Sequence, residues 1–543
     1  SRGLGDVYKR QDNYLFYKND GLQNQSVLYI QKGLKDEPRI LLDPNTLSKD
    51  GTVSLGGISF SHDNKFMAYS LGKAGSDWQE IFVMEVETGK VLKDKIEWTK
   101  FGGASWRGNG FYYSRYDKPE HTNIMSAVNT YQKVYFHQLG QPQSKDLLVY
   151  QDAKYPLRYY WPSITEDEEF LFINISEGTS GGEIWFADLK NGKDTDLNLL
   201  VKGFTYNPGV VETLNGKILV MTDQDAPKYK LVAIDPKNTA VENWQTVIPE
   251  GKHLLEWVSL IGNKLFAGYQ QDVSSHIYQL TTEGKKEKEI EIAGIGSVGG
   301  FGGSKKDMEC FYSFTSFTVP NIIYRYDIAL GKSELFKTID FPTDLGGYET
   351  KQVFYPSKDG TKIPMFITSK KDLQLDGNNP TLLYGYGGFN ISITPSFSTS
   401  KIAFLEQGGV FVVANLRGGG EYGEDWHKAG MLEKKQTVFD DFIAAAEYLI
   451  KEKYTNPNKL AIQGRSNGGL LVGACMTQRP ELFKVALPGV GVLDMLRYHK
   501  STVGWGWAVE YGKSDVKAEF DYLVKYSPLH NICLLYTSDA ADE

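Results

Sequence analysis

The sequence predicts two domains: a β-propeller of seven blades, followed by an α/β domain built on a doubly wound, mostly parallel sheet. Three observations lead to this fold class: the length of the chain, a repeat of aromatic strand cores in its first part, and an alternation of strands and helices in the rest. The chain has 543 residues, whereas a single hydrophobic core stops growing at roughly 250–300 residues. We expect the propeller at residues 12–343 and the α/β domain at residues 344–532.

The first part of the chain repeats a strand core that is rich in aromatic residues. Seven such cores, spaced roughly 45–60 residues apart, begin at Tyr14, Phe66, Phe111, Phe170, Ile218, Leu265 and Cys310. A second strand follows most of them, and turn sequences such as "SHDN" and "LNGK" separate them. This spacing is typical of propeller blades. A large β-sandwich and a smaller propeller stay open as alternatives, and the WD signature of one propeller class is missing.

The pattern changes after Tyr348. Residues 351–371 have the pattern of a β-hairpin, and beyond them apolar runs alternate with helical patterns. The expected strands are 381–389, 409–423, 459–464 and 484–492, and the expected helices are 437–454 and 467–478. Such alternation indicates a mostly parallel sheet with helices on both faces. The continuous apolar runs fit strands that are buried on both sides.

Composition and charge are those of an ordinary globular protein. Apolar residues make up 41% of the chain and charged residues 23%, as is usual. The net charge of −8 argues against nucleic acid and anionic membranes as partners. No apolar run approaches the roughly 20 residues of a membrane-spanning helix. No metal-binding motif such as HExxH occurs, and no cofactor is predicted.

The cysteines and the two ends of the chain bear on the compartment. Cys310, Cys475 and Cys533 form no disulfide framework, which fits a reducing compartment. No secretory signal is visible. Residues 1–11 and 533–543 are expected to be non-native ends, because both resemble translated adaptor sequence. We predict a cytoplasmic protein. A periplasmic or secreted protein stays open, because the native N-terminus is missing if residues 1–11 are non-native.

The stretch "KLAIQGRSNGGLLVGACM", residues 459–476, places a serine between glycines where an expected strand meets an expected helix. Gly464-Arg465-Ser466-Asn467-Gly468 fits the pattern G-x-S-x-G. In that pattern the serine projects from a strained turn, and small residues on either side let strand and helix approach closely. The helix N-terminus would face the oxyanion that forms after attack. We therefore predict that Ser466 is a nucleophile. The alternative, an Asn-Gly hairpin turn, would need a strand after Gly469.

Several long segments of the chain match a known family in order. They are "LLYGYGGFNISITPSFS", "ANLRGGGEYGEDWHKAG", "FDDFIAAAEYLI", "GRSNGGLLVGACMTQRPELF" and "YHKSTVGWGWAVEYG", with "DPNTLSKDGTVSL" and "FYPSKDGTKIPMFI" upstream. From about residue 12 to residue 532, the chain resembles the prolyl oligopeptidases (prolyl endopeptidases). The resemblance implies an α/β-hydrolase domain under a seven-bladed propeller that excludes folded proteins. It also implies a monomeric, cofactor-free serine peptidase that cleaves short proline-containing peptides on the carboxyl side of proline.

The resemblance also implies roles for single residues. Ser466 matches the nucleophile. Asn467 matches the residue whose backbone N–H is one oxyanion donor, and Tyr386 matches the tyrosine whose hydroxyl is the other.

The proline pocket is inferred in the same way. Trp507 matches the indole that stacks on the substrate proline, and the other walls match Phe389, Val492 and Tyr511. A flat aromatic surface suits a proline ring, which brings apolar faces and no N–H to satisfy. A tryptophan packed in the core is the alternative for Trp507.

The sequence departs from the family pattern at the segment "WGW", where "HAW" is commoner, at the nucleophile and at the end of the resemblance. Arg465 stands directly before the nucleophile, where the family usually has glycine. The order in α/β-hydrolases is serine, then acid, then histidine, and the resemblance ends after Ile532, before the family's aspartate and histidine. His499 and His530 follow Ser466 but match neither position. We therefore expect the chain as written to be inactive.

Two other functions stay open. An oligopeptidase of the same superfamily with another specificity, such as cleavage after basic residues, would need acidic residues in place of Trp507. A propeller interaction module with a remnant hydrolase half would bind peptides without turnover. The G-x-G-x-x-G match at residues 294–299 is followed by a strand-like segment, so it does not predict a nucleotide site. His427 is a lone histidine without metal-ligand spacing.

Overall fold

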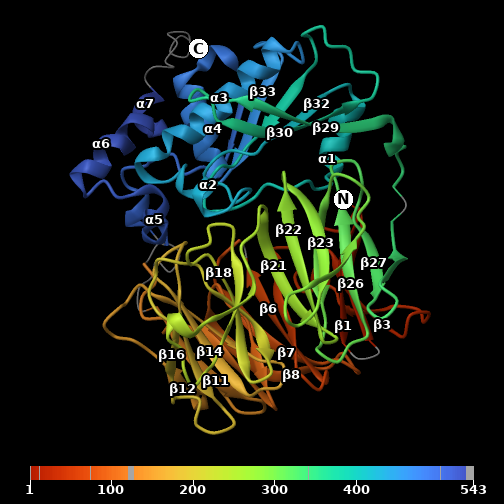
Figure 1. The fold of residues 1–543 in the computed structure, drawn as a ribbon, viewed down its shortest axis with the longest axis vertical. Coiled ribbons are helices and arrows are strands. Elements are labelled where there is room, and N and C mark those ends of the chain that lie inside the picture. Colours follow the sequence, from red (N-terminus) through yellow and green to blue (C-terminus); the bar gives the residue numbers. More distant parts are fainter. Residues whose placement is uncertain are drawn as a thin grey trace.

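The computed structural model describes residues 2–10, 13–73, 75–119, 128–339, 341–501 and 503–532. Two domains are stacked: a propeller, coloured red to green, and an α/β domain, coloured teal to blue (Figure 1). The predicted fold class, a seven-bladed β-propeller with an α/β-hydrolase domain, is confirmed. Within the described ranges, no helix is both long and apolar enough to cross a membrane. Residues 533–543 lie outside these ranges.

The propeller consists of seven antiparallel sheets of four strands, each built from consecutive strands. Blade 1 contains β1 (Arg2–Arg10), β2 (Asn13–Asp20), β3 (Val27–Lys32) and β4 (Arg39–Leu42). Blade 2 contains β5 (Val53–Phe60), β6 (Phe66–Lys73), β7 (Gln79–Glu85) and β8 (Val91–Thr99). Blade 3 contains β9 (Ser105–Arg107), β10 (Gly110–Arg115), β11 (Lys133–Gln138) and β12 (Leu147–Tyr150). Blade 4 contains β13 (Tyr159–Ile164), β14 (Phe170–Ser176), β15 (Glu183–Asp188) and β16 (Asn198–Val201).

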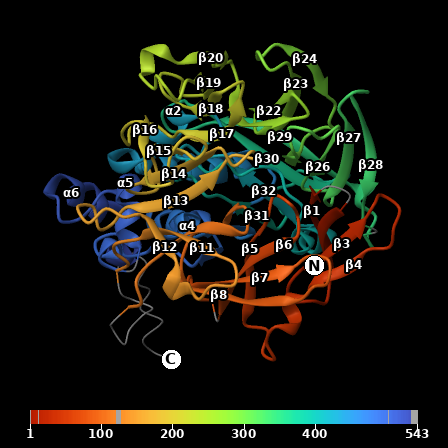
Figure 2. The ribbon, with the colours of Figure 1, turned by 90° about the horizontal axis from the view of Figure 1, so that it is seen from below.

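The remaining three blades follow the same plan. Blade 5 contains β17 (Gly209–Leu214), β18 (Lys217–Thr222), β19 (Lys230–Ile234) and β20 (Gln245–Ile248). Blade 6 contains β21 (Leu254–Ile261), β22 (Lys264–Gln271), β23 (Ser274–Leu280) and β24 (Lys286–Ile290). Blade 7 contains β25 (Ser297–Gly302), β26 (Glu309–Thr315), β27 (Ile322–Asp327) and β28 (Lys332–Lys337). Figure 2 shows the blades arranged in a ring.

The aromatic strand cores found in the sequence are the second strands of the seven blades. These strands lie in the interior of their sheets, between two other strands, and both of their faces are covered. The burial of β10 shows this, since all of its residues but the last are buried. A strand covered on both faces is expected to be apolar along its whole length, which explains why these strands carried the clearest sequence signal.

Blade 1 begins before residue 12, the boundary expected from the sequence. Residues 2–10 form β1, which pairs antiparallel with β2. The sequence of this strand, "RGLGDVYKR", has no apolar run that would have predicted it.

Apolar clusters between neighbouring blades close the ring. Each of seven clusters joins two adjacent blades, and one of them joins blade 7 to blade 1. In that last cluster, Tyr14 and Phe16 pack against Phe311 and Ile323. The Tyr14 hydroxyl also donates to Glu309 Oε1 at 3.1 Å. The chain runs across the other six blade boundaries but not across this one, where the contacts among the described residues include this apolar cluster and the Tyr14–Glu309 hydrogen bond.

The α/β domain is built on one six-stranded sheet. Its strands are β29 (Tyr348–Pro356), β30 (Lys362–Lys370), β31 (Thr381–Tyr384), β32 (Val410–Ala414), β33 (Leu460–Arg465) and β34 (Val485–Gly489). They lie in the order β29-β30-β32-β31-β33-β34. The pairs from β32 to β34 are parallel, and the first two pairs are antiparallel. The predicted hairpin is thus an antiparallel extension of the parallel sheet.

Helices cover both faces of this sheet. They are α1 (Thr399–Glu406), α2 (Glu424–Lys428), α3 (Gln436–Lys451), α4 (Asn467–Gln478), α5 (Ala508–Tyr511), α6 (Lys517–Tyr526) and α7 (Pro528–Asn531). The main core gathers apolar side chains of α3 and α4 against one face. A second core on the other face includes α1 and also Val273 and Phe317 of the propeller. The sheet is therefore in direct contact with the propeller on that side.

Candidate active site

Ser466 occupies the turn between β33 and α4. Its backbone has φ 55° and ψ −116°, a conformation that costs a non-glycine residue about 1–3 kcal/mol. Two glycines make the turn possible. A Cβ on Gly464 would lie 2.2 Å from the Gly468 carbonyl oxygen, and a Cβ on Gly468 would lie 2.7 Å from the Gly385 carbonyl oxygen. A helix follows the turn, so the alternative of an Asn-Gly hairpin is wrong, and the serine side chain is exposed.

Two hydrogen-bond donors are placed beside this serine. Asn467 is the first residue of α4, so its backbone N–H belongs to the donors that have no partner within the helix. Tyr386 lines the same cavity as Ser466. Burial and the negative charge of Glu510 raise the pKa of the Tyr386 phenol, and hydrogen bonding with Ser466 offsets part of this rise. Tyr386 is therefore a protonated donor at neutral pH.

The Asn467 side chain ties the surrounding loops together. Its Nδ2 donates to the Tyr386 carbonyl oxygen at 2.6 Å. Its Oδ1 accepts from the Tyr511 hydroxyl at 2.8 Å. Asn467 itself is buried. One amide thus fixes the loop that carries Tyr386 and the short helix α5 relative to the serine.

The four residues predicted for the proline pocket line one cavity together with Ser466 and Tyr386. The Phe389 and Tyr511 rings meet edge to face at 5.3 Å. Trp507 lies nearly parallel to the Tyr498 ring at 6.3 Å. Trp507 packs against the main core but also lines the cavity. The structure therefore brings the seven predicted site residues together, with Asn467 behind the cavity wall.

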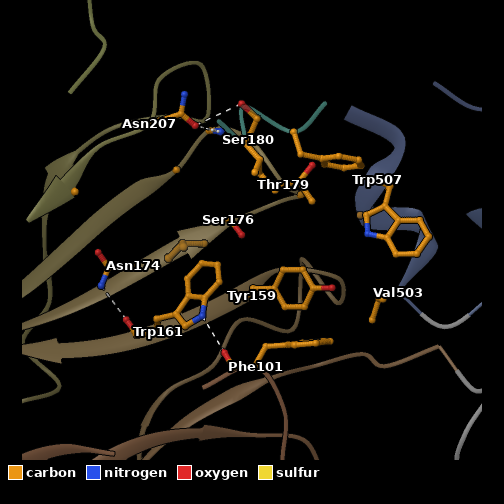
Figure 3. Close-up of a pocket in the computed structure, with 18 of the residues that line it drawn as sticks. Phe101, Tyr159, Trp161, Asn174, Ser176, Thr179, Ser180, Asn207, Val503 and Trp507 are labelled. Carbon is orange, nitrogen blue, oxygen red and sulfur yellow. Dashed lines mark hydrogen bonds between the residues drawn. The ribbon is translucent and has the colours of Figure 1, made fainter. Parts of the chain in front are cut away.

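The cavity lies between the two domains and measures about 820 Å³, within the range of about 300–1,000 Å³ that is typical of ligand sites. In Figure 3, Trp507 and Val503 lie across it from Tyr159, Trp161 and Asn174 of the propeller. The Trp161 indole donates to the Phe101 carbonyl oxygen at 3.0 Å. Sequence reasoning missed the propeller side of the site, because single aromatic and amide residues in an aromatic-rich repeat carry no distinguishing signal.

A buried cluster of charges lies behind the pocket. His427 Nδ1 is 3.3 Å from Glu424 Oε2, and His427 Nε2 is 2.8 Å from Glu510 Oε2. Lys435 Nζ is 3.2 Å from Glu510 Oε1 and donates to the Gly387 carbonyl oxygen at 3.0 Å. Burial lowers the pKa of His427, but the two glutamates more than offset this and raise it to about 9. His427 is therefore an imidazolium, and not the lone histidine that its sequence context suggests.

Glu424 also joins the cluster to the propeller. Its Oε1 accepts from Asn207 Nδ2 at 3.2 Å and from the Tyr229 hydroxyl at 3.1 Å, both on the propeller. The same oxygen accepts from Asn390 Nδ2 at 2.6 Å, in the loop that carries Phe389. One carboxylate thus connects the propeller to the loop that carries Phe389, which lines the cavity.

The histidines that follow Ser466 are engaged elsewhere. His499 Nε2 lies 3.0 Å from Asp515 Oδ2, and His530 Nδ1 lies 2.8 Å from Ser527 Oγ. Among the residues that the structure describes, no histidine forms a hydrogen bond with Ser466 Oγ. Among the described residues, Ser466 and Tyr386 therefore share the cavity without a histidine paired to the serine.

Two family models match the chain on either side of the domain boundary. Residues 5–338 match "Prolyl oligopeptidase, N-terminal beta-propeller domain", and residues 395–540 match "Prolyl oligopeptidase family". The chain belongs to the prolyl oligopeptidase family. It is 46% identical to a prolyl endopeptidase of Elizabethkingia miricola, over 97% of this chain and 74% of that protein. It is 37% identical to a prolyl endopeptidase of Dictyostelium discoideum, over 97% of this chain and 78% of that protein.

Solved structures of this prolyl oligopeptidase family have the same fold. One, from a study of two prolyl endopeptidases, superposes with a TM-score of 0.93 at 39% identity, over 98% of this chain and 78% of that one. Prolyl oligopeptidase B from Galerina marginata, bound to a 25mer macrocyclization substrate, gives a TM-score of 0.92 at 33% identity with the same coverage. The apo form of that protein gives 0.73. The overall arrangement of this chain is thus closer to the substrate-bound form than to the apo form.

Proposed function

We propose that the cavity is the site of a serine oligopeptidase that binds short peptides and cleaves them on the carboxyl side of proline. The observation that carries the proposal is the shared cavity: a strained, exposed serine, a tyrosine and the aromatic side chains of Phe389, Trp507 and Tyr511 line it together. A monomeric, cofactor-free protein that acts in the cytoplasm remains part of this proposal.

The mechanism follows from the positions of these groups. Ser466 Oγ attacks the carbonyl carbon of the proline residue, and a base must take the serine proton. The Asn467 N–H and the Tyr386 O–H stabilise the oxyanion of the tetrahedral intermediate. The C–N bond then breaks, the amine leaves with a proton, and water hydrolyses the acyl-enzyme ester. Trp507 and Phe389 select proline, because a flat aromatic wall matches the apolar faces of the ring.

The second part of the proposal is that the chain as given binds peptides but does not turn them over. A serine hydroxyl is a poor nucleophile unless a positioned base accepts its proton. The histidines of α2 and of the segments after Ser466 are held by Glu424, Glu510, Asp515 and Ser527 instead. A residual rate is expected from the oxyanion donors, since triad variants of other proteases still accelerate hydrolysis roughly 10³–10⁴-fold over the reaction in water.

Two measurements test the two parts separately. Binding of a fluorescein-labelled Gly-Pro peptide, followed by anisotropy, is expected to weaken when Trp507 is changed to alanine. Equal affinity in both proteins would overturn the assignment of the pocket. Labelling of Ser466 by a fluorophosphonate is expected to be slow, and turnover of a proline-linked chromogenic peptide is expected to be near background. Robust turnover that Ser466→Ala abolishes would overturn the inactivity of the chain.

A further inference from the structure

Arg465 stands directly before the nucleophile, and its side chain is exposed. Along β33, Leu460 and Ile462 pack into the main core with α4. Because side chains alternate along a strand, Gln463 and Arg465 face the other side of the sheet. The contact of Gln463 with Lys401 of α1 agrees with this. Within the described part of the chain, no hydrogen bond or ion pair engages the Arg465 guanidinium.

A second cation lies on the same face. Lys401 Nζ donates to Gln463 Oε1 at 2.7 Å and lies 4.8 Å from the centre of the Phe411 ring. No carboxylate forms an ion pair with it among the described residues, and burial lowers the pKa of its ammonium group. Among the described residues, Arg465, which directly precedes the nucleophile, and Lys401, which is hydrogen-bonded to Gln463, are thus two cations without an acidic partner, in a chain whose net charge is −8. Such a local excess of positive charge attracts anions.

The position of Arg465 relative to the cavity determines which half of a peptide substrate it can contact: the part before or the part after the scissile bond. Ser466, Tyr386 and Trp507 line the cavity between the domains, and Arg465 does not. If proline and the residues before it occupy that cavity, the residues after the scissile bond must leave Ser466 on another side. Arg465 is exposed and one residue from Ser466, so it is available to that leaving half.

We propose that Arg465 is a specificity-determining residue that binds a carboxylate in the leaving half of the peptide, with Lys401 adding to the positive field. This rests on the proposed function of the cavity. A guanidinium presents paired N–H donors that match a carboxylate. The carboxylate is either the C-terminus of a peptide that ends one or two residues after proline, or an acidic side chain at those positions.

Direct binding distinguishes these sources, and the full chain with Ser466→Ala prevents any turnover during the measurement. Three fluorescein-labelled peptides are compared by anisotropy: Gly-Pro-Ala-Ala as the free acid, the same peptide as the C-terminal amide, and Gly-Pro-Glu-Ala as the amide. We expect the free acid to bind about three- to tenfold more tightly than its amide at low salt. The difference should shrink in 0.5 M salt, where charges are screened within about 4–5 Å.

Substitution identifies the cation responsible. Arg465→Gln is expected to remove the preference for the acid while the affinity for the amide stays the same, which also shows that the variant is folded. Lys459→Gln, at the residue just before the start of the same strand, is the matched control and should retain the preference. If only the free acid gains affinity, the peptide C-terminus is the ligand; if the glutamate peptide gains as well, the site accepts acidic side chains. Tight binding of all three peptides, unchanged by Arg465→Gln, would overturn the inference and leave the proposed function intact. Failure of every peptide to bind would instead overturn the proposed function.

Discussion

Replacing Glu424 by glutamine tests whether the buried cluster behind the pocket holds a protonated histidine. The pKa of His427 is raised from 6.5 to about 9. Each factor of ten in proton affinity corresponds to about 1.4 kcal/mol, so the folded protein stabilises the imidazolium by about 3 kcal/mol relative to the unfolded chain. Glu424 and Glu510 share this stabilisation, and glutamine keeps the volume of one partner but not its charge. We expect Glu424→Gln to lose about half of this stabilisation of the imidazolium, roughly 1.5 kcal/mol.

The sign of the pH dependence follows from the raised pKa. A group whose pKa is higher in the folded state contributes its full stability below its unfolded pKa, and loses it as pH rises through the folded value. For His427 this window runs from about 6.5 to about 9. The parent chain and Glu424→Gln differ in their free energy of unfolding. This difference should be about 1.5 kcal/mol larger at pH 6 than at pH 10, with the parent the more stable. Lys435 titrates in the opposite sense, but it is present in both proteins.

The assay is urea denaturation, followed by circular dichroism, at pH 6 and at pH 10. Asp425→Asn is the matched control, because Asp425 is the next residue on α2 and its side chain is exposed. The control should change stability equally at both pH values. An equal difference between the parent and Glu424→Gln at pH 6 and pH 10 would refute the reasoning, since Glu424 would then not hold His427 protonated.

Three further predictions concern the pocket, the propeller and the cysteines. Trp507→Ala should weaken binding of a Gly-Pro peptide by at least the roughly 0.5–1.5 kcal/mol of aromatic stacking, with a smaller loss for a Gly-Ala peptide; equal losses would mean that Trp507 only supports the fold. His137 is fully buried, 2.7 Å from Asp146 and 3.0 Å from Asp94. His137→Gln should therefore lower the free energy of unfolding, measured by guanidinium denaturation, by about 3–5 kcal/mol, as breaking a buried ion pair does. A loss of stability no larger than that of a surface substitution would contradict this. Burial raises the pKa of the Cys310 and Cys475 thiols, so iodoacetamide should modify them at pH 7.5 only after unfolding. If mass spectrometry finds either cysteine alkylated in the native chain, their burial is disproved.

Patterns that repeat or that combine several local signals were readable from the sequence. The blade count followed from strands such as those at Phe111 and Phe170, because interior strands are apolar along their whole length. The turn at Ser466 followed from its spacing of glycines, since strand, turn and helix each left a mark within twenty residues. These features are local, and local features are what a single sequence records.

The parts of the site that the sequence did not predict depend on contacts between distant residues. His427 and Glu510 are 83 positions apart, and Asn207 and Glu424 are 217 positions apart. The local sequence around either partner does not indicate such a contact. The strand β1 was missed for a different reason, because its pairing with β2 and its place beside blade 7 do not require an apolar run.

The boundary between blades 7 and 1 makes the ring topologically open. The polypeptide forms a linear string of seven blades whose two ends meet, and the contacts that join them among the described residues are non-covalent, such as the apolar cluster and the hydrogen bond of Tyr14 with Glu309. Pulling the first and last blades apart would break no covalent link and would extract no strand from a sheet. Mechanical force applied along the rim should therefore split the ring at this seam first. A circular permutant that joins β28 to β1 through a linker would turn the seam into a continuous chain and move the weakest boundary elsewhere.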